Sequence, residues 1–168
     1  HFKSKEDILE AVTNRMTEES NRLLAVIRDR TDLNGKEKLA MMFRNSLLRP
    51  EQNKIFQVAP NISSSPGLLF SMLHDTVDVV TPDYMLPVFL QGVADGSIKT
   101  DYPKELAELI MLLANIWLNP MTFDDSPEKV YRKVMVFCQM MRGLGLDIVD
   151  EEIVKRMFEL TVIYNKNK

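Results

Sequence analysis

The sequence predicts an all-α protein, a bundle of about seven helices, and three observations lead to this fold class. Apolar residues recur at helical spacing along most of the chain. Ser, Asn and Asp stand where helices are expected to begin, and Gly or Pro where they are expected to end. No segment alternates polar and apolar residues for long enough to form a strand. We expect one domain over residues 1–168, because the chain has ordinary domain length and no internal repeat or linker.

The first half of the chain divides at polar and proline-containing positions. Asn34, with Glu37 three residues later, forms the pattern of a capping box at a helix start. Pro50 ends that helix, and the polar run NISSSPG at 61–67 is expected to be a loop. A further break is expected before the Thr-Pro pair at 81–82. The helices predicted in this half are 4–28, 34–49, 52–58, 69–80 and one that begins at 81, includes Val93 and ends near 92–96.

The stretch at 89–118 is the centre of the prediction. Pro103 suits the first turn of a helix. Apolar residues at helical spacing then follow at Leu106, Ile110, Leu113 and Trp117. Within 109–118 Asn115 is the only polar residue, so this helix is apolar nearly all round. We therefore expect it to be covered on two sides, by its own domain and by a second subunit.

A second helix, at 127–144, offers the same excess of apolar surface. Ser126 and Pro127 suit its start, and Gly143 and Gly145 suit its end; Asp150 caps a last helix. Two such helices from each subunit predict a homodimer held by a four-helix bundle. The expected interface residues are Leu109, Leu113, Val130, Val134, Phe137 and Met141.

Composition excludes several classes of function. A net charge of −3 argues against nucleic-acid binding by these residues alone. The single cysteine, Cys138, excludes an internal disulfide and is typical of a protein of the reducing cytoplasm. No apolar run reaches the roughly 18 residues that a membrane span needs. Hydrolase and nucleotide-binding motifs and paired metal ligands are missing from the sequence, so we expect no enzyme, metal or cofactor.

Two groups of short motifs carry a resemblance to a known family. Gly92, ADGS at 94–97, DYP at 101–103 and ELA at 105–107 form one group, and HFKSKEDIL at 1–9 forms the other. Together they resemble the regulatory domain of transcriptional regulators of the tetracycline-repressor (TetR) family. The resemblance implies a TetR-type C-terminal helical bundle that binds a small effector and dimerises. The family's helix-turn-helix would precede the first residue of this chain.

The resemblance also implies a mechanism and a contact with DNA. Residues 1–5 would form the junction to the DNA-binding part, where His1 and Lys5 would touch the DNA backbone. A small, apolar effector in the helical core would favour one tilt of the helix at 4–28. That tilt would set the spacing of the two DNA-binding parts in the dimer, most simply as a repressor. Operator DNA would be bound only through the part that precedes this chain.

The 11 methionines indicate where such an effector would bind. Their flexible thioethers suit walls that repack around varied apolar ligands, although they fill an ordinary core equally well. Asn115 has three candidate partners: a neighbouring helix, a ligand, or its copy across a dimer axis. The expected ligand-binding residues are Met42, Phe70, Met72, His74, Met85, Phe89, Asn115 and Trp117.

Two other functions are compatible with the same sequence. One is a helical interaction module without a DNA-binding part, which would act by forming mixed dimers. The other is a small lipid-binding protein, for which the apolar core is the argument. A helix-turn-helix pattern encoded directly upstream would favour the regulator over both.

Overall fold

The computed structural model describes residues 5–59 and 61–166. Every described element is a helix and none is a strand, which confirms the all-α prediction. The elements are α1 (Lys5–Arg28), α2 (Gly35–Leu48), α3 (Glu51–Val58), η1 (Ile62–Ser64), α4 (Pro66–His74), η2 (Asp75–Met85), α5 (Leu86–Asp95), α6 (Pro103–Leu112), η3 (Leu113–Trp117), α7 (Pro120–Phe123), α8 (Pro127–Gly143) and α9 (Glu151–Asn165).

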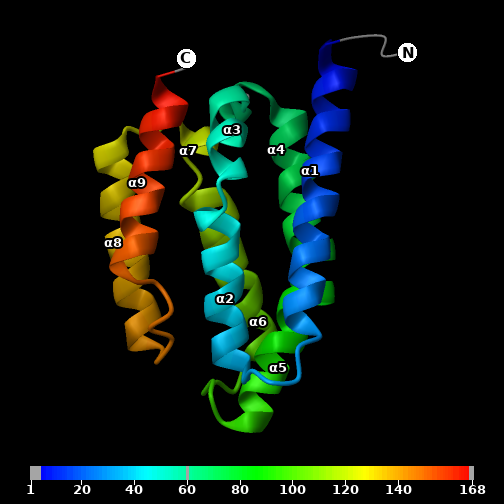
Figure 1. The fold of residues 1–168 in the computed structure, drawn as a ribbon, viewed down its shortest axis with the longest axis vertical. Helices are drawn as coiled ribbons and strands as arrows, with labels where there is room; N and C mark the ends of the chain where they lie inside the picture. Colours follow the sequence, from blue (N-terminus) through cyan, green and yellow to red (C-terminus); the bar gives the residue numbers. More distant parts are fainter. Residues whose placement is uncertain (1–4, 60, 167–168) are drawn as a thin grey trace.

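The long helices run along one direction, with α1 on one side, α8 and α9 on the other, and α2 between them (Figure 1). Both ends of the described chain lie at the same end of this bundle, together with α3, α4 and α7. We call that the open end. The opposite end, formed by the turn from α1 to α2, by α5 and by the start of α6, is the closed end. The main apolar core lies between them, with Leu39, Phe89 and Phe137 almost fully buried. A second, smaller apolar cluster joins α3, η1, α7 and α9.

The closed end is held by a direct approach of two backbones. A Cβ atom added to Gly35 at the start of α2 would lie 2.3 Å from the Cα of Gly92 in α5. No other residue type therefore fits at Gly35 without moving a helix. Buried beside this contact, the Lys38 Nζ donates to the carbonyl of Arg28 at 2.7 Å and to the Gln91 Oε1 at 2.5 Å. This ammonium ties the end of α1 to α2 and α5.

The turn after α5 caps the start of α2. The Asp95 carboxylate accepts a hydrogen bond from the Gly35 N–H at 2.9 Å, and the Ser97 Oγ accepts one from the Lys36 N–H at 3.1 Å. Gly96 makes the turn possible, because its φ of 79° is left-handed. The ADGS segment thus satisfies backbone donors that the first turn of α2 leaves without helical partners.

One helix continues where the sequence predicted a break. α4, η2 and α5 follow one another without interruption from Pro66 to Asp95, so the predicted end before the Thr-Pro pair at 81–82 is wrong. The middle segment η2 is π-helical, with wider turns than an α-helix, and Pro82 lies inside it. The Thr81 hydroxyl donates to the Thr76 carbonyl at 2.6 Å, five residues back. The wider turn accommodates the proline ring that an α-helical turn would exclude.

The predicted helix starts are confirmed where caps were recognised. Asn34 and Glu37 form the reciprocal capping box, with distances of 2.9 Å and 2.8 Å between their side chains and each other's backbone N–H. Ser126 caps α8 and Asp150 caps α9 through the N–H three residues on. Because such caps involve only neighbouring residues, the sequence alone defines them.

The loop predicted at 61–67 and the connection from η3 to α8 both contain short helices. The segment at 61–67 forms η1 and the start of α4, and the segment after η3 contains the single turn α7. In both, an Asn side chain accepts from the N–H two residues on, Asn61 from Ser63 and Asn119 from Met121, at 3.0 Å each. These local bonds turn a polar, proline-containing segment into helix.

Candidate functional site

A cavity of about 360 Å³ lies towards the open end, beneath α1. Its walls come from α1, α2, α3, α4, η2, α6 and η3, so segments far apart in the sequence meet around it. Both π-helical segments contribute to the wall. The volume lies at the lower end of the range typical of small-molecule sites. We take this cavity as the candidate site.

Most of the wall is apolar and flexible. Five methionines line it, and they come from five different elements. The apolar lining residues are Met16, Leu23, Leu24, Met42, Phe43, Ile55, Leu68, Met72, Val80, Met85, Met111 and Ala114. Unbranched thioether side chains adjust to ligands of different shape more readily than branched ones.

A polar strip on α1 faces the same space. Thr17, Ser20 and Asn21 line the cavity, in the stretch where the apolar stripe of α1 is interrupted. Asn115 lies in η3 and donates through its Nδ2 to the carbonyl of Met111 at 3.0 Å. That bond uses the helix's own backbone, and the side chain still lines the cavity. The cavity therefore offers hydrogen-bonding groups as well as apolar contact.

Two charged side chains line the cavity, and their surroundings differ. The guanidinium of Arg49 contacts the carboxylate of Glu19 in α1 at 2.9 Å and that of Glu51 at 3.5 Å. Asp75, the first residue of η2, is half-buried on the cavity wall. Within the described residues, its carboxylate has no ion pair and accepts no side-chain hydrogen bond. The arginine is thus neutralised, and the aspartate is not.

A second cavity of about 180 Å³ adjoins the first on the side of α8 and α9. The two share Phe43, Ser46, Ala114 and Asn115 in their walls. Beyond these residues the second cavity is lined by the core of the bundle, where the rings of Phe43 and Phe137 stack 6.0 Å apart. The four shared residues therefore lie at the boundary of the two cavities.

The structure brings together half of the residues predicted to bind a ligand. Met42, Met72, Met85 and Asn115 line the main cavity from four elements. The sequence analysis missed the contributions of α1, because a polar interruption of an amphipathic helix also suits a solvated face. It also missed Arg49, Asp75 and Met111. The interrupted stripe at 17–22 was the available signal.

The other four predicted residues lie outside the cavity wall. Phe70 is 73% exposed on the outer face of α4, and His74 is exposed and pairs with Asp78 at 2.7 Å. Phe89 is fully buried in the core and is not among the residues that line either cavity. Trp117 faces α8, with its ring 5.4 Å from the Nζ of Lys133. Helical spacing placed these residues on helices but did not say which face meets the cavity.

The residues predicted to form a dimer interface divide in a similar way. Val130, Val134, Phe137 and Met141 are almost fully buried in the core of the subunit itself, so they offer no surface to a partner. Leu113 packs partly against that core. Leu109 is 47% exposed on α6, and Val136 and Met140 are exposed on α8 beside the buried stripe. The exposed apolar residues of these two helices are therefore mostly different from those predicted.

The two predicted DNA contacts lie beyond the structural description. His1 is outside the described residues. Lys5 begins α1, but its side chain is not among those described. Both contacts stay predictions.

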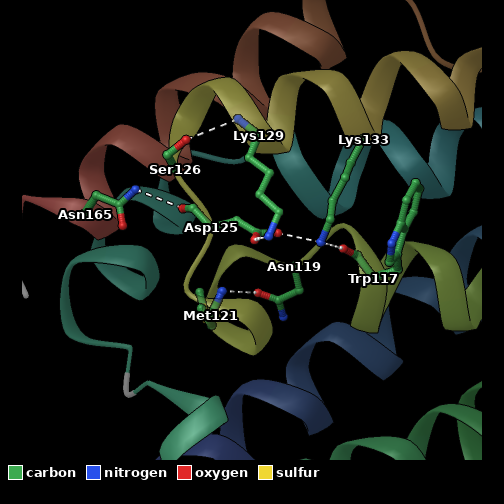
Figure 2. A network of polar contacts seen from close by, with 8 residues as sticks. All are labelled: Trp117, Asn119, Met121, Asp125, Ser126, Lys129, Lys133 and Asn165. Atoms are coloured by element: carbon green, nitrogen blue, oxygen red, sulfur yellow. Dashed lines mark hydrogen bonds and ion pairs between the residues drawn. The ribbon is translucent and has the colours of Figure 1, made fainter.

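A buried charge network fixes the open end on the side away from α1 (Figure 2). The Asp125 carboxylate, 1% exposed, contacts the Nζ atoms of Lys129 and Lys133 at 2.5 Å each. Lys133 also donates to the carbonyl of Trp117 at 2.9 Å, and Asn165 donates to that of Asp125 at 3.1 Å. Burial raises the pKa of Asp125, but the bonds from the two lysines outweigh it and hold this pKa below the usual carboxyl value. The network joins η3, α8 and α9.

A larger depression of about 600 Å³ lies between α8 and α9 and is open to solvent. Charged side chains such as Arg142, Glu151 and Lys155 surround it. Apolar residues such as Met135, Val154 and Phe158 also line it, but its walls come from α8, α9 and the turn between them, whereas seven elements surround the cavity beneath α1.

In the described part of the chain, no group of three His, Cys, Asp or Glu side chains is arranged to hold a metal ion. Of the helices in residues 5–59 and 61–166, none has the length and hydropathy to cross a membrane. Comparison of the sequence and structure with protein-family models, characterised proteins and solved structures finds no match.

Proposed function

We propose that this chain is the effector-binding and dimerisation domain of a ligand-responsive transcriptional regulator of the TetR type. The observation that carries the proposal is the position of the cavity. Part of its polar wall belongs to α1, the helix that would lead to a preceding DNA-binding part. A ligand in this cavity contacts α1 directly, through Thr17, Ser20 and Asn21. No relay through other elements is needed.

The mechanism is a shift between two tilts of α1. At the closed end, Lys38 holds the carbonyl of Arg28, the last residue of α1, so this end is fixed. Towards the open end, α1 rests on the cavity rather than on a filled core. A ligand that fits one tilt better than the other increases the population of that tilt. In a dimer the change alters the spacing of two DNA-binding parts that must match major-groove turns ~34 Å apart.

Dimerisation uses the apolar residues that the subunit leaves exposed on α6 and α8. Leu109, Val136 and Met140 are large, apolar and exposed, and Phe123 lies exposed between these helices in sequence. Large exposed apolar residues that form a contiguous patch are characteristic of interaction surfaces, and we propose that these residues form one. Pairing of α6 and α8 with their copies would form a closed, symmetric four-helix bundle.

The test measures the distance between the two α1 helices in the dimer. Replacing Asn14, exposed on α1, by Cys in a Cys138→Ala background gives one spin label per subunit. Double electron–electron resonance then reports the α1–α1 distance with and without the neutral apolar probe N-phenyl-1-naphthylamine. We expect a dimer in sedimentation and a changed distance distribution with the probe.

A cavity-filling variant provides the matched control. Ala114 lines both cavities, so Ala114→Phe should block the probe and remove its effect on the distance. Ala94→Phe, on the exposed face of α5, should leave both unchanged. The proposed regulatory function would be refuted by a monomer at all concentrations, or by a dimer whose α1–α1 distance does not change when the probe binds.

The adjoining second cavity favours one alternative, a small lipid-binding protein. Together the two cavities form an elongated apolar space past Asn115, as an extended lipid chain requires. This alternative predicts binding of apolar probes without a change in the α1–α1 distance. The same resonance experiment therefore separates the two functions.

A further inference from the structure

The charge balance of the cavity indicates which ligands it selects. The described lining residues include one cation, Arg49, and one anion, Asp75. Arg49 already contacts two carboxylates, those of Glu19 at 2.9 Å and Glu51 at 3.5 Å. No described residue neutralises Asp75. A ligand therefore meets one uncompensated negative charge in a largely apolar wall.

The next acidic residue on η2 shows that this lack of a partner is specific to Asp75. Asp78, three residues on, is exposed and pairs with His74 at 2.7 Å. Asp75 lies on the half-buried side of the same helix, next to Thr76 and one turn before Val80 on the cavity wall. An unpaired carboxylate beside apolar residues loses hydration without gaining a partner, so it favours a cation there.

The rest of the wall suits a large, weakly hydrated cation. Methionine sulfur is polarizable, and the ring of Phe43 offers an aromatic face. A small, strongly hydrated ion would need several more oxygen ligands, and no metal-binding group occurs among the described residues. An anionic ligand would have to displace Glu19 from Arg49 and would also face Asp75.

We propose that the cavity beneath α1 selects lipophilic monovalent cations, with Asp75 as the counter-charge. The inference rests on the proposed function in one respect, since it takes this cavity as the effector site. An organic cation with an aromatic body places its charge near Asp75 and its apolar surface against the methionines. Selectivity for cations follows from one carboxylate, and tolerance for different bodies follows from the flexible wall.

The experiment compares two ions of the same shape and opposite charge, tetraphenylphosphonium and tetraphenylborate, by isothermal titration calorimetry. We expect the phosphonium to bind at least 10-fold more tightly than the borate. Asp75→Asn should weaken phosphonium binding about 10-fold and leave the neutral probe N-phenyl-1-naphthylamine unaffected. Asp78→Asn, which removes the same charge on the outer face of the helix, should change neither. Asp75→Glu keeps the charge and should keep the preference, so it replaces Asp75→Asn if that variant fails to fold.

The outcomes separate this inference from the proposed function. Equal binding of the two ions, or phosphonium binding that survives Asp75→Asn, overturns the cation site. If the neutral probe still changes the α1–α1 distance, the proposed regulatory function stands even though the cation site does not. If phosphonium binds through Asp75 but the α1–α1 distance stays constant, the cation site stands and the regulator fails.

Discussion

The two ends of the bundle use the same helices in opposite ways. At the closed end, α2 and α5 approach until two glycine backbones touch, and side chains from the following turn bond the first N–H groups of α2. Towards the open end, α2 and η2, the segment that leads into α5, leave a cavity beneath α1. Firm packing at one end allows a cavity at the other without loss of the fold. It also gives α1 a fixed point from which to tilt.

Helix geometry follows the same division. The cavity wall includes Thr76, Val80 and Met85 from η2, and Ala114 and Asn115 from η3. Both of these segments are π-helical, whereas α2 and α5 at the closed end are regular α-helices. Wide π-helical turns recur at functional sites because they redirect side chains that a regular helix would place elsewhere. The irregularity lies where the ligand is expected.

The largest expected effect comes from two phenylalanines, one in the closed core and one on the open end. Phe89 is fully buried, so Phe89→Ala should lower the free energy of unfolding by about 4 kcal/mol. Phe70 is 73% exposed, so Phe70→Ala should change it by less than about 0.5 kcal/mol. Urea denaturation followed by circular dichroism measures both. Equal losses would mean that the two ends are packed alike.

The second prediction concerns the charge network that supports the open end opposite α1. Asp125→Asn leaves Lys133, whose side chain is 11% exposed, without its anionic partner, and should cost about 3 kcal/mol. Asp147→Asn, which removes an exposed partner of Arg142 at 3.5 Å, is the control and should cost less than about 1 kcal/mol. Thermal unfolding of the two variants tests the difference. A small cost at Asp125 would show that packing alone holds this side.

The third prediction tests the backbone contact at the closed end. Gly35→Ala places a methyl group 2.3 Å from the Cα of Gly92 and should destabilise by about 2 kcal/mol, since helix backbones yield less than side chains. Gly67, in the first turn of α4, has open space around the same added atom. Gly67→Ala should therefore be neutral or stabilise by up to about 1 kcal/mol. Chemical denaturation of the two variants distinguishes the steric clash expected at Gly35 from the general effect of replacing a helical glycine by alanine.

The sequence could predict what depends on neighbouring residues. The capping box at Asn34, the caps at Ser126 and Asp150, and the all-α class were predictable because each depends on local bonds or on periodicity. The continuous helix through Pro82 was not, because a π-helical turn leaves no distinct period in a sequence. The cavity also depends on how helices diverge, and residue types do not encode that.

The same limit explains the misplaced site residues. Phe70 and Phe89 are the same residue type on one helical stretch, yet one lies in solvent and the other in the core. The regular apolar stripe of α8 that includes Phe137 was assigned to a partner, although the subunit's own core takes the most regular stripe first. The exposed Val136 and Met140, beside that stripe, are what remains for an interface.

The smallest effect is expected at Asp95, whose carboxylate caps α2 at the closed end. The side chain of Ser97 and then the N–H groups of Gly35 and Ser97 lower the pKa of Asp95 below its ordinary value. A carboxyl whose pKa is lower in the folded state stabilises the protein at pH values above its unfolded pKa of about 3.9. That contribution is lost as the pH falls through the lower, folded value.

Asp95→Asn removes the charge but keeps one acceptor oxygen, so its cost should be smaller than that of Gly35→Ala. The difference in urea midpoint between the parent chain and this variant should be constant near neutral pH and should shrink below about pH 4. Asp101→Asn, which makes the same charge change at an exposed position nearby, should show no such difference at neutral pH. Other acidic groups titrate in both proteins and cancel in the comparison. If the Asp95→Asn difference persisted unchanged at low pH, the shape of the cap rather than its charge would secure the closed end.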